Sequence, residues 1–326
     1  MAKQSINIGT SANDGTGSTL REAFDICNDN FTELYGGTTS ALGFKSEGTN
    51  FTGSLLIGHS TTGVISSAEN NTGLGIGALD ALTTGDQNVA VGYNAGTSIN
   101  SGSKNIVVGF AAGDALSSGN NNVAIGYNAL TTEDTGDDSI AIGRNALKNQ
   151  NFNGSSYNVA VGRDAGFSVT SGVQNTIIGG LAGDALTTGN KNVAIGYNAL
   201  STEDTQGNTV AVGFEALKNQ NATAISYNVA IGSSAGANIT TGIKNTLMGG
   251  LVGSSLTTGS ENVAIGYAAL ISEDAHGKNV AIGKSALTTQ DAGIDAYNVA
   301  VGFEAGKQVT TGAQNTLIGG LAGDAL

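Results

Sequence analysis

Three pairs of neighbouring acidic residues are the side chains of this sequence best placed to bind a ligand. They are Glu133-Asp134, Glu203-Asp204 and Glu273-Asp274, at equal intervals along the chain. An oxygen-rich loop such as Glu133 to Asp138 is of the kind that can hold Ca²⁺, which prefers oxygen ligands. We favour solvated surface loops over an ion site, and we expect no metal ligands in the chain.

The two histidines and the single cysteine offer no clearer chemistry. His59 and His276 stand in unlike sequence contexts, with no partner Cys and no shared spacing, and Cys27 excludes a disulfide within the chain. No pair of carboxylates stands out for glycoside hydrolysis. The sequence therefore predicts no catalytic residue and no cofactor, and we expect that the protein is not an enzyme.

A glycine that closes pentapeptides such as NVAIG, Asn192 to Gly196, recurs through three quarters of the chain. Successive positions of this glycine differ by 17, 17, 17 and then 19, and the pattern repeats. Four such units make a block of roughly 70 residues, and a fixed period of this kind is typical of a solenoid. The repeated glycines are Gly92, Gly109, Gly126, Gly143, Gly162, Gly179, Gly196, Gly213, Gly232, Gly249, Gly266, Gly283, Gly302 and Gly319.

Apolar residues alternate in size within each pentapeptide. Val193 and Ile195 flank Ala194, which is the two-residue period of a β-strand. We expect the large residues to fill the interior and the alanines to allow close approach of another layer. A second apolar feature, Ala199-Leu200, predicts a second short strand in each coil, after a turn. Coils stacked about 4.8 Å apart would form a rod of about 70 Å.

Asparagine stands four positions before the repeated glycine in every unit except those with Ser139 and Thr209. Stacked in register, these amides could form a side-chain hydrogen-bond ladder along the rod. Alternatively, Asn is there because it tolerates the turn conformation before each strand. Both interpretations stay open at this stage.

Aromatic residues often follow the repeated glycine, as at Tyr93, Phe110 and Tyr127. Such rings could offer a stacking surface for a glycan. We favour the simpler interpretation that they cover a turn.

Composition and charge exclude several classes of partner. The chain has 51 Gly, no Pro and no Trp, which fits a backbone held by ladders between coils rather than a packed globular core. A net charge of −13 argues against nucleic acid and anionic lipid, since both need clustered Lys and Arg. No apolar run approaches a membrane span or a secretory signal, so we expect a chain made in the cytoplasm.

After a short strand-like piece at Ser5 to Ile8, the sequence predicts a helix. A capping box of Thr19 and Glu22 precedes a helix that we expect to end at Tyr35, before Gly36-Gly37. Because a helix with a narrow apolar stripe is marginal alone, we expect it to pair with copies of itself in a homotrimer or with another protein. The alternative is packing on the end of its own solenoid. The apolar stripe comprises Leu20, Phe24, Cys27, Phe31 and Leu34.

The segment INIGTSANDGTGSTLREAFDICNDNFTELY, Ile6 to Tyr35, resembles the N-terminal motif of many tail-fibre and virion structural proteins of tailed phages. The resemblance implies that it attaches a trimeric fibre to tail, baseplate or neck proteins of the particle. Ser18 stands where the motif usually has an acidic residue, and Ile26-Cys27-Asn28 stands where it usually has Lys-Ile-Asn. The residues that carry this implied attachment are Ile6, Ile8, Asp14, Leu20, Arg21, Phe24, Phe31, Leu34 and Tyr35.

The repeat itself resembles the head of the trimeric autotransporter adhesins, whose units read approximately NSVAIG. This resemblance implies a left-handed parallel β-roll in an intertwined homotrimer. Coils with steps of 17 to 19 are longer than is usual there, and we expect the extra residues in surface loops such as Thr131 to Asp138 and Ser201 to Asn208.

Together these observations predict a mainly β chain of three regions. Residues 1–36 form the virion-attachment segment, 37–72 an irregular linker with a degenerate first coil at Ser54 to Ser60, and 73–326 the β-roll. We assign that first coil because Gly58 lies 19 residues before Gly77, which matches one of the repeat intervals. Because Leu326 falls in the middle of a unit, we expect a longer natural protein or a partner on that end.

The predicted function is that of a trimeric tail fibre in the virion that reaches toward a host glycan or protein. The alternative is a neck or baseplate connector without receptor binding. A bacterial trimeric surface adhesin is a weaker alternative, because the roll fits but no signal segment or membrane anchor is found.

Overall fold

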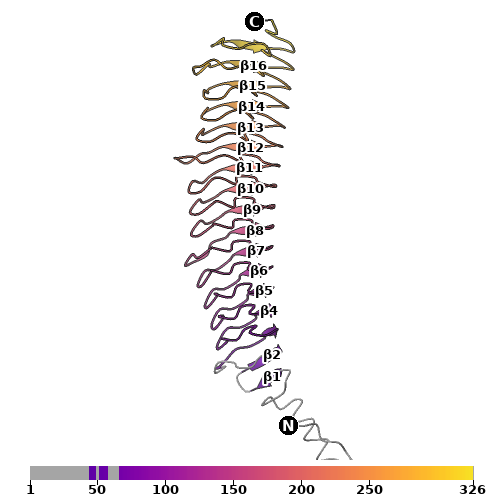
Figure 1. Ribbon diagram of the computed structural model, residues 1–326, viewed down its shortest axis with the longest axis vertical. Helices are drawn as coiled ribbons and strands as arrows, with labels where there is room; N and C mark the ends of the chain where they lie inside the picture. Colours follow the sequence, from indigo (N-terminus) through magenta and orange to yellow (C-terminus); the bar gives the residue numbers. More distant parts are fainter. Residues whose placement is uncertain (1–43, 49–50, 58–65, 326) are drawn as a thin grey trace, which may run out of the picture.

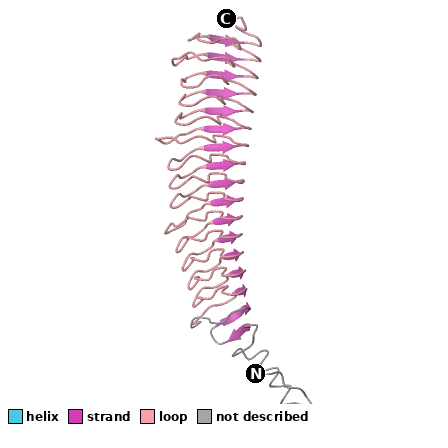
Figure 2. Ribbon diagram, in the orientation of Figure 1, coloured by secondary structure: helices cyan, strands magenta, loops and turns pink. Residues whose placement is uncertain are grey.

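The computed structural model describes residues 44–48, 51–57 and 66–325, and they form a rod of stacked coils (Figure 1). Equivalent strands lie one above another on one side of the rod, and loops form the other side (Figure 2). Fifteen successive coils, from Thr72 to Ile318, each contribute one three-residue strand. The predicted parallel β-solenoid is therefore confirmed. Its handedness and its association into a trimer stay predictions, and the helix expected over Thr19 to Tyr35 lies outside the described residues.

All strands belong to one sheet of 17 strands. β1 (Phe44–Gly48) pairs antiparallel with β2 (Phe51–Ile57), and each later strand pairs in parallel with the next. The remaining strands are β3 (Thr72–Leu74), β4 (Val89–Val91), β5 (Ile106–Val108), β6 (Val123–Ile125), β7 (Ile140–Ile142), β8 (Val159–Val161), β9 (Thr176–Ile178), β10 (Val193–Ile195), β11 (Val210–Val212), β12 (Val229–Ile231), β13 (Thr246–Met248), β14 (Val263–Ile265), β15 (Val280–Ile282), β16 (Val299–Val301) and β17 (Thr316–Ile318).

The register of the first coil differs from the predicted one. Leu56 in β2 lies opposite Gly73 in β3, so the step is 17 rather than the 19 counted from Gly58 to Gly77. Gly75 closes the next coil, because a Cβ on it would lie 2.4 Å from the carbonyl oxygen of Gly92. The segment around Leu56 therefore does begin the stack, but the glycine that follows it in register is Gly75 and not Gly77.

The middle residue of each strand from β3 to β17 points into the coil, and its two neighbours point outward. Ala194 is fully buried, whereas Val193 and Ile195 are only partly buried. The prediction that the large residues fill the interior is therefore wrong. The interior has little room for them, because Ala199 and Leu200 of the same coil are also fully buried and already occupy it.

Coils with a larger inward residue confirm how narrow the interior is. β9 carries Ile177 in the middle position, and Ala182-Gly183 stands where the coil of β10 reads Ala-Leu. Ala-Gly also occurs in coils with an inward Ala, such as Ala165-Gly166 in the coil of β8. A Cβ on Gly183 would lie 2.9 Å from Cδ1 of Leu186 and 3.5 Å from Cδ1 of Ile177. In the coil of β9 the absence of a side chain at Gly183 thus leaves room for Ile177 and Leu186.

Only one strand forms in each of the fifteen described coils, where two were predicted. Asn198 and Leu200, in the segment expected to be the second strand, have φ values of 53° each. These left-handed conformations cannot continue a strand. The segment is nevertheless tied to its neighbour, since the backbone N–H of Leu200 donates to the carbonyl of Ala216 at 3.0 Å.

The glycine that closes each strand is required by its backbone and by its neighbour. Gly196 has a φ of 135°, and a Cβ there would lie 2.2 Å from the carbonyl oxygen of Gly213 in the next coil. Any other residue would both strain the backbone and collide with the adjacent coil.

The asparagines form a buried ladder along the rod. The backbone N–H of Asn105 donates to Oδ1 of Asn88 at 3.0 Å, and Nδ2 of Asn105 donates to the carbonyl of Gly119 at 2.8 Å. The left-handed conformation falls instead on the preceding residue, such as Lys104 with a φ of 61°, where the residue type varies. Of the two interpretations left open, the ladder is therefore confirmed, and tolerance of the turn does not explain these asparagines.

Candidate functional surfaces

The predicted attachment residues, from Ile6 to Tyr35, lie outside the described part of the chain, as do the helix stripe with Cys27 and the histidine at His59. Their predicted roles in attachment and in the helix therefore stay predictions. Within the described ranges no helix is long and apolar enough to cross a membrane.

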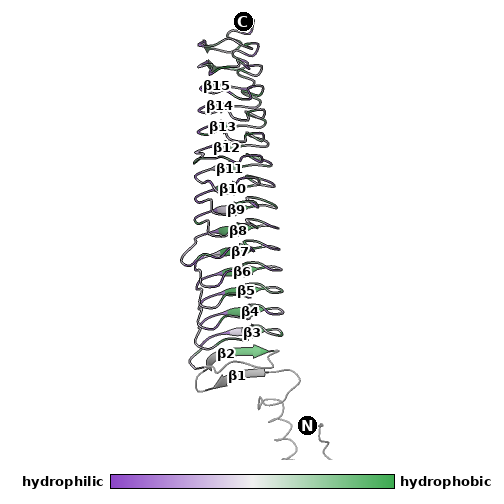
Figure 3. Ribbon diagram, turned by 60° about the vertical axis from the view of Figure 1, so that its left-hand side comes forward, coloured by the Kyte–Doolittle hydropathy of each residue, from purple (hydrophilic) through white to green (hydrophobic). Residues whose placement is uncertain are grey.

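The outward face of the sheet is largely apolar, and the strands from β4 to β8 are coloured as hydrophobic in Figure 3. Two residues of each strand, such as Val193 and Ile195 in β10, point outward, and none of the strands from β3 to β17 contains a charged residue. Parallel sheets are normally covered on both faces, and an apolar patch this long marks an interaction surface. The most exposed of these side chains are Leu74, Val89, Ile106, Ile178, Ile231, Met248 and Ile318.

A second exposed feature is a ladder of aromatic rings. The ring of Phe110 stacks between those of Tyr93 and Tyr127, with centroids 5.2 Å apart in both pairs. Tyr197 and Phe214 stack in the same way at 5.7 Å. Each of these rings is about half exposed. They therefore pack against one another between coils and still present an edge to solvent, which leaves both predicted roles possible.

The first acidic pair leads into a buried polar cluster rather than a solvated loop. Glu133 is fully buried, and its Oε1 accepts the backbone N–H of Gly136 at 2.9 Å. Its Oε2 accepts Nε2 of Gln150 at 2.9 Å, and the same amide donates to Oγ of Ser139 at 2.6 Å. Ser139 in turn contacts Oγ of Ser156 at 2.7 Å. The prediction of a solvated loop is therefore wrong for this glutamate, although its neighbour in the pair is exposed.

The second acidic pair repeats this cluster. Glu203 is fully buried and accepts Nε2 of Gln220 at 3.0 Å. Gln220 also donates to Oγ1 of Thr209, which contacts Oγ of Ser226. Thr209 here and the serine at the same place in the first cluster are the two exceptions to the asparagine ladder. Their short hydroxyl side chains complete these clusters.

The third acidic pair has lost the hydroxyl residues of this arrangement. Asn279 replaces the ladder hydroxyl, and Ala296 replaces the serine that stands at Ser156 and Ser226. In this cluster Oε2 of Glu273, Nε2 of Gln290 and Nδ2 of Asn279 are buried without a hydrogen-bond partner. Buried polar atoms are seldom left in this state, so the third cluster needs a separate explanation.

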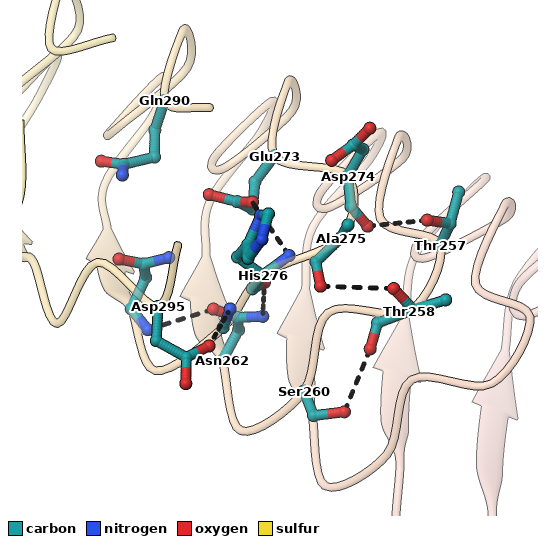
Figure 4. A network of polar contacts seen from close by, with 12 residues as sticks. Thr257, Thr258, Ser260, Asn262, Glu273, Asp274, Ala275, His276, Gln290 and Asp295 are labelled. Carbon is teal, nitrogen blue, oxygen red and sulfur yellow. Dashed lines mark hydrogen bonds and ion pairs between the residues drawn. The ribbon is translucent and has the colours of Figure 1, made fainter. Parts of the chain in front are cut away.

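The third cluster also carries two residues that the others lack. His276 occupies the position of Gly136 and Gln206, and Asp291 that of Asn151 and Asn221. The backbone N–H of His276 donates to Oε1 of Glu273 at 3.1 Å (Figure 4). The four residues that come together have one ligand atom each within 4.8 Å of the others, and they are Glu273, Asp274, His276 and Asp291.

Burial affects the protonation of Glu133 and Glu273. It raises the pKa of Glu133, against the opposing effect of hydrogen bonds from Gln150 and from backbone N–H groups. Burial likewise raises the pKa of Glu273; the His276 N–H and the His276 charge oppose this, and Asp291 and Asp274 add to it. The cost of removing a carboxylate from water is the larger effect in both clusters.

An exposed ion pair distinguishes the same region. Nζ of Lys278 lies 2.6 Å from Oδ2 of Asp295. The hydrogen bond between them raises the pKa of Lys278 and lowers that of Asp295. Because both side chains are exposed to solvent, this pair contributes little to stability.

Sequence reasoning missed the cluster around His276 because it treated each acidic pair as a loop of its own. A direct alignment of the three repeat blocks that contain Glu133, Glu203 and Glu273 would have shown the signal. His276 and Asp291 are substitutions specific to the third of these blocks.

Comparison of the chain with protein-family models, with curated proteins and with solved structures finds no match.

Proposed function

We propose that this protein is a structural component of a tailed-phage virion, a trimeric tail fibre made in the host cytoplasm. Its N-terminal segment would bind the tail, and its β-roll would extend toward the host surface. The resemblance of Ile6 to Tyr35 to the N-terminal motif of phage virion proteins supports the attachment. The geometry of the described rod supports the extension.

The single observation that carries the proposal is the outward apolar face of the sheet. A parallel sheet with one face in water would expose Val and Ile side chains over fifteen coils. Burial of such side chains is worth about 25 cal/mol per Å² of apolar area. A face of this length therefore favours a tightly bound partner.

The repeat of that face supports further copies of the same chain as the partner. Outward residues recur at every coil, spaced at the distance between neighbouring strands, about 4.8 Å. A partner that covers all of them must carry the same axial repeat. A second and a third copy of the rod meet this condition, and closed cyclic symmetry leaves no apolar face open.

The ladders between coils supply the stiffness that a fibre needs. Backbone hydrogen bonds join each strand to the next, and the buried asparagines add a second ladder, seen at Asn88 and Asn105. Each coil contacts only its neighbours, so length is set by the number of coils. Such a stiff rod suits a fibre that binds its target at a distance from the particle.

The exposed ring ladder is the candidate surface for a host glycan. Tyr93, Phe110 and Tyr127 each present the edge of a half-exposed ring, and the tyrosine hydroxyls along such a row can hydrogen-bond to a sugar. This binding role is separate from assembly of the fibre, and the connector alternative lacks it.

Electron microscopy of phage particles labelled with an antibody to residues 92–302 tests the proposal. Label on fibres leaving the tail is the expected result. Label confined to the neck would favour the connector alternative, and particles without label would contradict the virion assignment. Label on the surface of uninfected bacteria would instead favour the adhesin.

An adsorption assay then separates fibre from connector. Purified full-length protein should slow adsorption of the phage to its host. The triple substitution Tyr93→Ser, Phe110→Ser and Tyr127→Ser should reduce that competition if the ring ladder contacts the receptor, while a change at the exposed Asn190 serves as control. No competition by the wild-type protein would count against receptor binding by the roll.

A further inference from the structure

We propose that the third acidic pair and its neighbours hold a divalent transition-metal ion, with zinc as the best-fitting member of the class. The ligands are Glu273, Asp274, His276 and Asp291. One ligand atom from each lies within 4.8 Å of the others, and the Glu273 and His276 side chains lie against each other (Figure 4). This inference does not depend on the proposed role of the chain in a virion.

Unpartnered buried atoms point into this cluster. Glu273 is fully buried, yet its Oε2 has no hydrogen-bond partner. Nδ1 of His276 is buried and unpartnered as well, and it lies 3.7 Å from Oε1 of Glu273, too far for a hydrogen bond. A carboxylate oxygen and an imidazole nitrogen are two of the atom types that bind zinc in proteins, and here neither has a hydrogen-bond partner.

The other two blocks have the acidic pair but lack the histidine and the second aspartate of this cluster. At Glu133 and Glu203 the corresponding Oε2 atom is satisfied by a glutamine amide. Those blocks carry Gly136 and Gln206 where the third has His276. The full ligand set is therefore present in one of the three blocks only, and there the equivalent amide of Gln290 does not donate to Glu273.

The donor chemistry selects the class of ion. One imidazole nitrogen and three carboxylates suit zinc and its neighbours, whereas calcium and magnesium prefer sites built of oxygen alone. Zinc–ligand distances of about 2.1 Å place tetrahedral donors roughly 3.4 Å apart, so the cluster must contract slightly. Asp274 and Asp291 are exposed and can turn toward the buried Glu273.

No neighbouring cation occupies the place of the metal among the described residues. Lys278, the nearby lysine, is held by Asp295 at 2.6 Å. This lysine is therefore paired outside the cluster. Because Glu273 and His276 precede β15 and Asp291 follows it, the ion would clamp two successive coils.

Zinc content of the full-length protein tests this site. The protein is freed of metal with a chelator, equilibrated with zinc chloride and dialysed, and zinc per chain is measured. The two variants are His276→Gln and Asp291→Asn, which carry a residue of the second block (Gln206) and one found in both other blocks (Asn151 and Asn221) and are therefore expected to fold. Circular dichroism melting of the metal-free proteins checks that folding is unchanged.

We expect wild-type protein to hold one zinc ion per chain more than His276→Gln, and zinc affinity to fall at least about tenfold in Asp291→Asn. Zinc should also raise the melting temperature of the wild type but not of His276→Gln. His59→Gln, which changes the other histidine, should bind like the wild type. Equal zinc content in wild type and His276→Gln would overturn the proposal, as would displacement of zinc by equimolar calcium.

Discussion

The strand side of the coil and the loop side differ in how much they vary along the rod. On the strand side every coil repeats the same plan, with a small or medium residue inward and mostly β-branched residues outward. On the loop side the three blocks with acidic pairs diverge, and equivalent positions such as Gly136, Gln206 and His276 are chemically unlike. Strand residues must keep the register of the sheet, whereas loop residues are not held in this way. Substitutions that change the chemistry of a side chain are therefore tolerated more readily on the loop side.

The largest expected effect on the strand side comes from Gly196→Ala. The new Cβ would lie 2.2 Å from the carbonyl oxygen of Gly213, in a backbone with a φ of 135°. We expect a loss of about 3 kcal/mol or more in the free energy of unfolding, measured by denaturant titration.

Gly293→Ala on the loop side is the matched control. Gly293 also has a positive φ, 69°, but a Cβ there would meet nothing within 4 Å. This substitution should lower the free energy of unfolding by about 1 kcal/mol. Equal losses for the two variants would remove the contrast between the two sides.

Asn192→Ala should have the next largest effect. Oδ1 of Asn192 accepts the backbone N–H of Thr209, and Nδ2 donates to the carbonyl of Gln206, both at 3.1 Å. Removing the side chain orphans buried groups, at a cost of about 2 to 4 kcal/mol. Asn190→Ala, an exposed asparagine whose Oδ1 accepts one backbone N–H at 2.7 Å, should cost less than about 1 kcal/mol. Denaturant unfolding of both variants gives the comparison, and a larger loss for Asn190→Ala would contradict the buried ladder.

The double substitution Ile195→Lys and Val212→Lys separates folding from association. Both side chains point outward and are only partly buried in the single chain, so the coil itself should lose little stability. Two charges in the middle of an apolar interface should instead prevent the chains from associating. Light scattering should then give the mass of one chain with the circular dichroism of a folded β protein. An unchanged assembly would show that this face is not the interface.

The smallest expected effect is a change in pH dependence on the loop side. Because burial raises the pKa of Glu133 above 4.5, the folded chain binds a proton more readily than the unfolded chain just above that pH. The stabilisation that this proton binding gives the folded chain is present at low pH. It is lost as the pH rises through the pKa of Glu133 in the folded chain. The free energy of unfolding should therefore be lower at pH 7 than at pH 5 in the wild type, and it should change less in Glu133→Gln.

Asp134→Asn is the control for this prediction, because it removes the same charge from an exposed neighbour of Glu133. It should keep the pH dependence of the wild type. A variant Glu133→Gln that behaves like the wild type at both pH values would show that the buried carboxyl is not responsible.

The difference between the two sides also explains what the sequence could predict. The constant period indicated the coil length, the parallel stack and the asparagine ladder, because each depends on a residue type that recurs in register. The inward direction of Ala194 could not be read from alternation alone, since a two-residue period is the same whichever face is inside. What decides it is the space left by Leu200 in the same coil.

The clusters at the acidic pairs could not be predicted from neighbouring residues in the sequence, for a different reason. Gln150 and Glu133 belong to different coils and meet only when the coils are stacked. The same holds for His276 and Asp291, whose proximity depends on the insertion that lengthens one coil in four. Sequence spacing indicates which residues share a coil position, but not which side chains reach across a coil boundary.

The mass of the intact wild-type chain in solution tests the central claim that the outward strand face is covered by copies of the chain. Light scattering on the purified protein, over a range of concentrations, gives this mass directly. The account predicts three times the chain mass of 32.3 kDa, stable to dilution. A folded protein with the mass of a single chain would contradict it, because the apolar face from β3 to β17 would then be exposed to water.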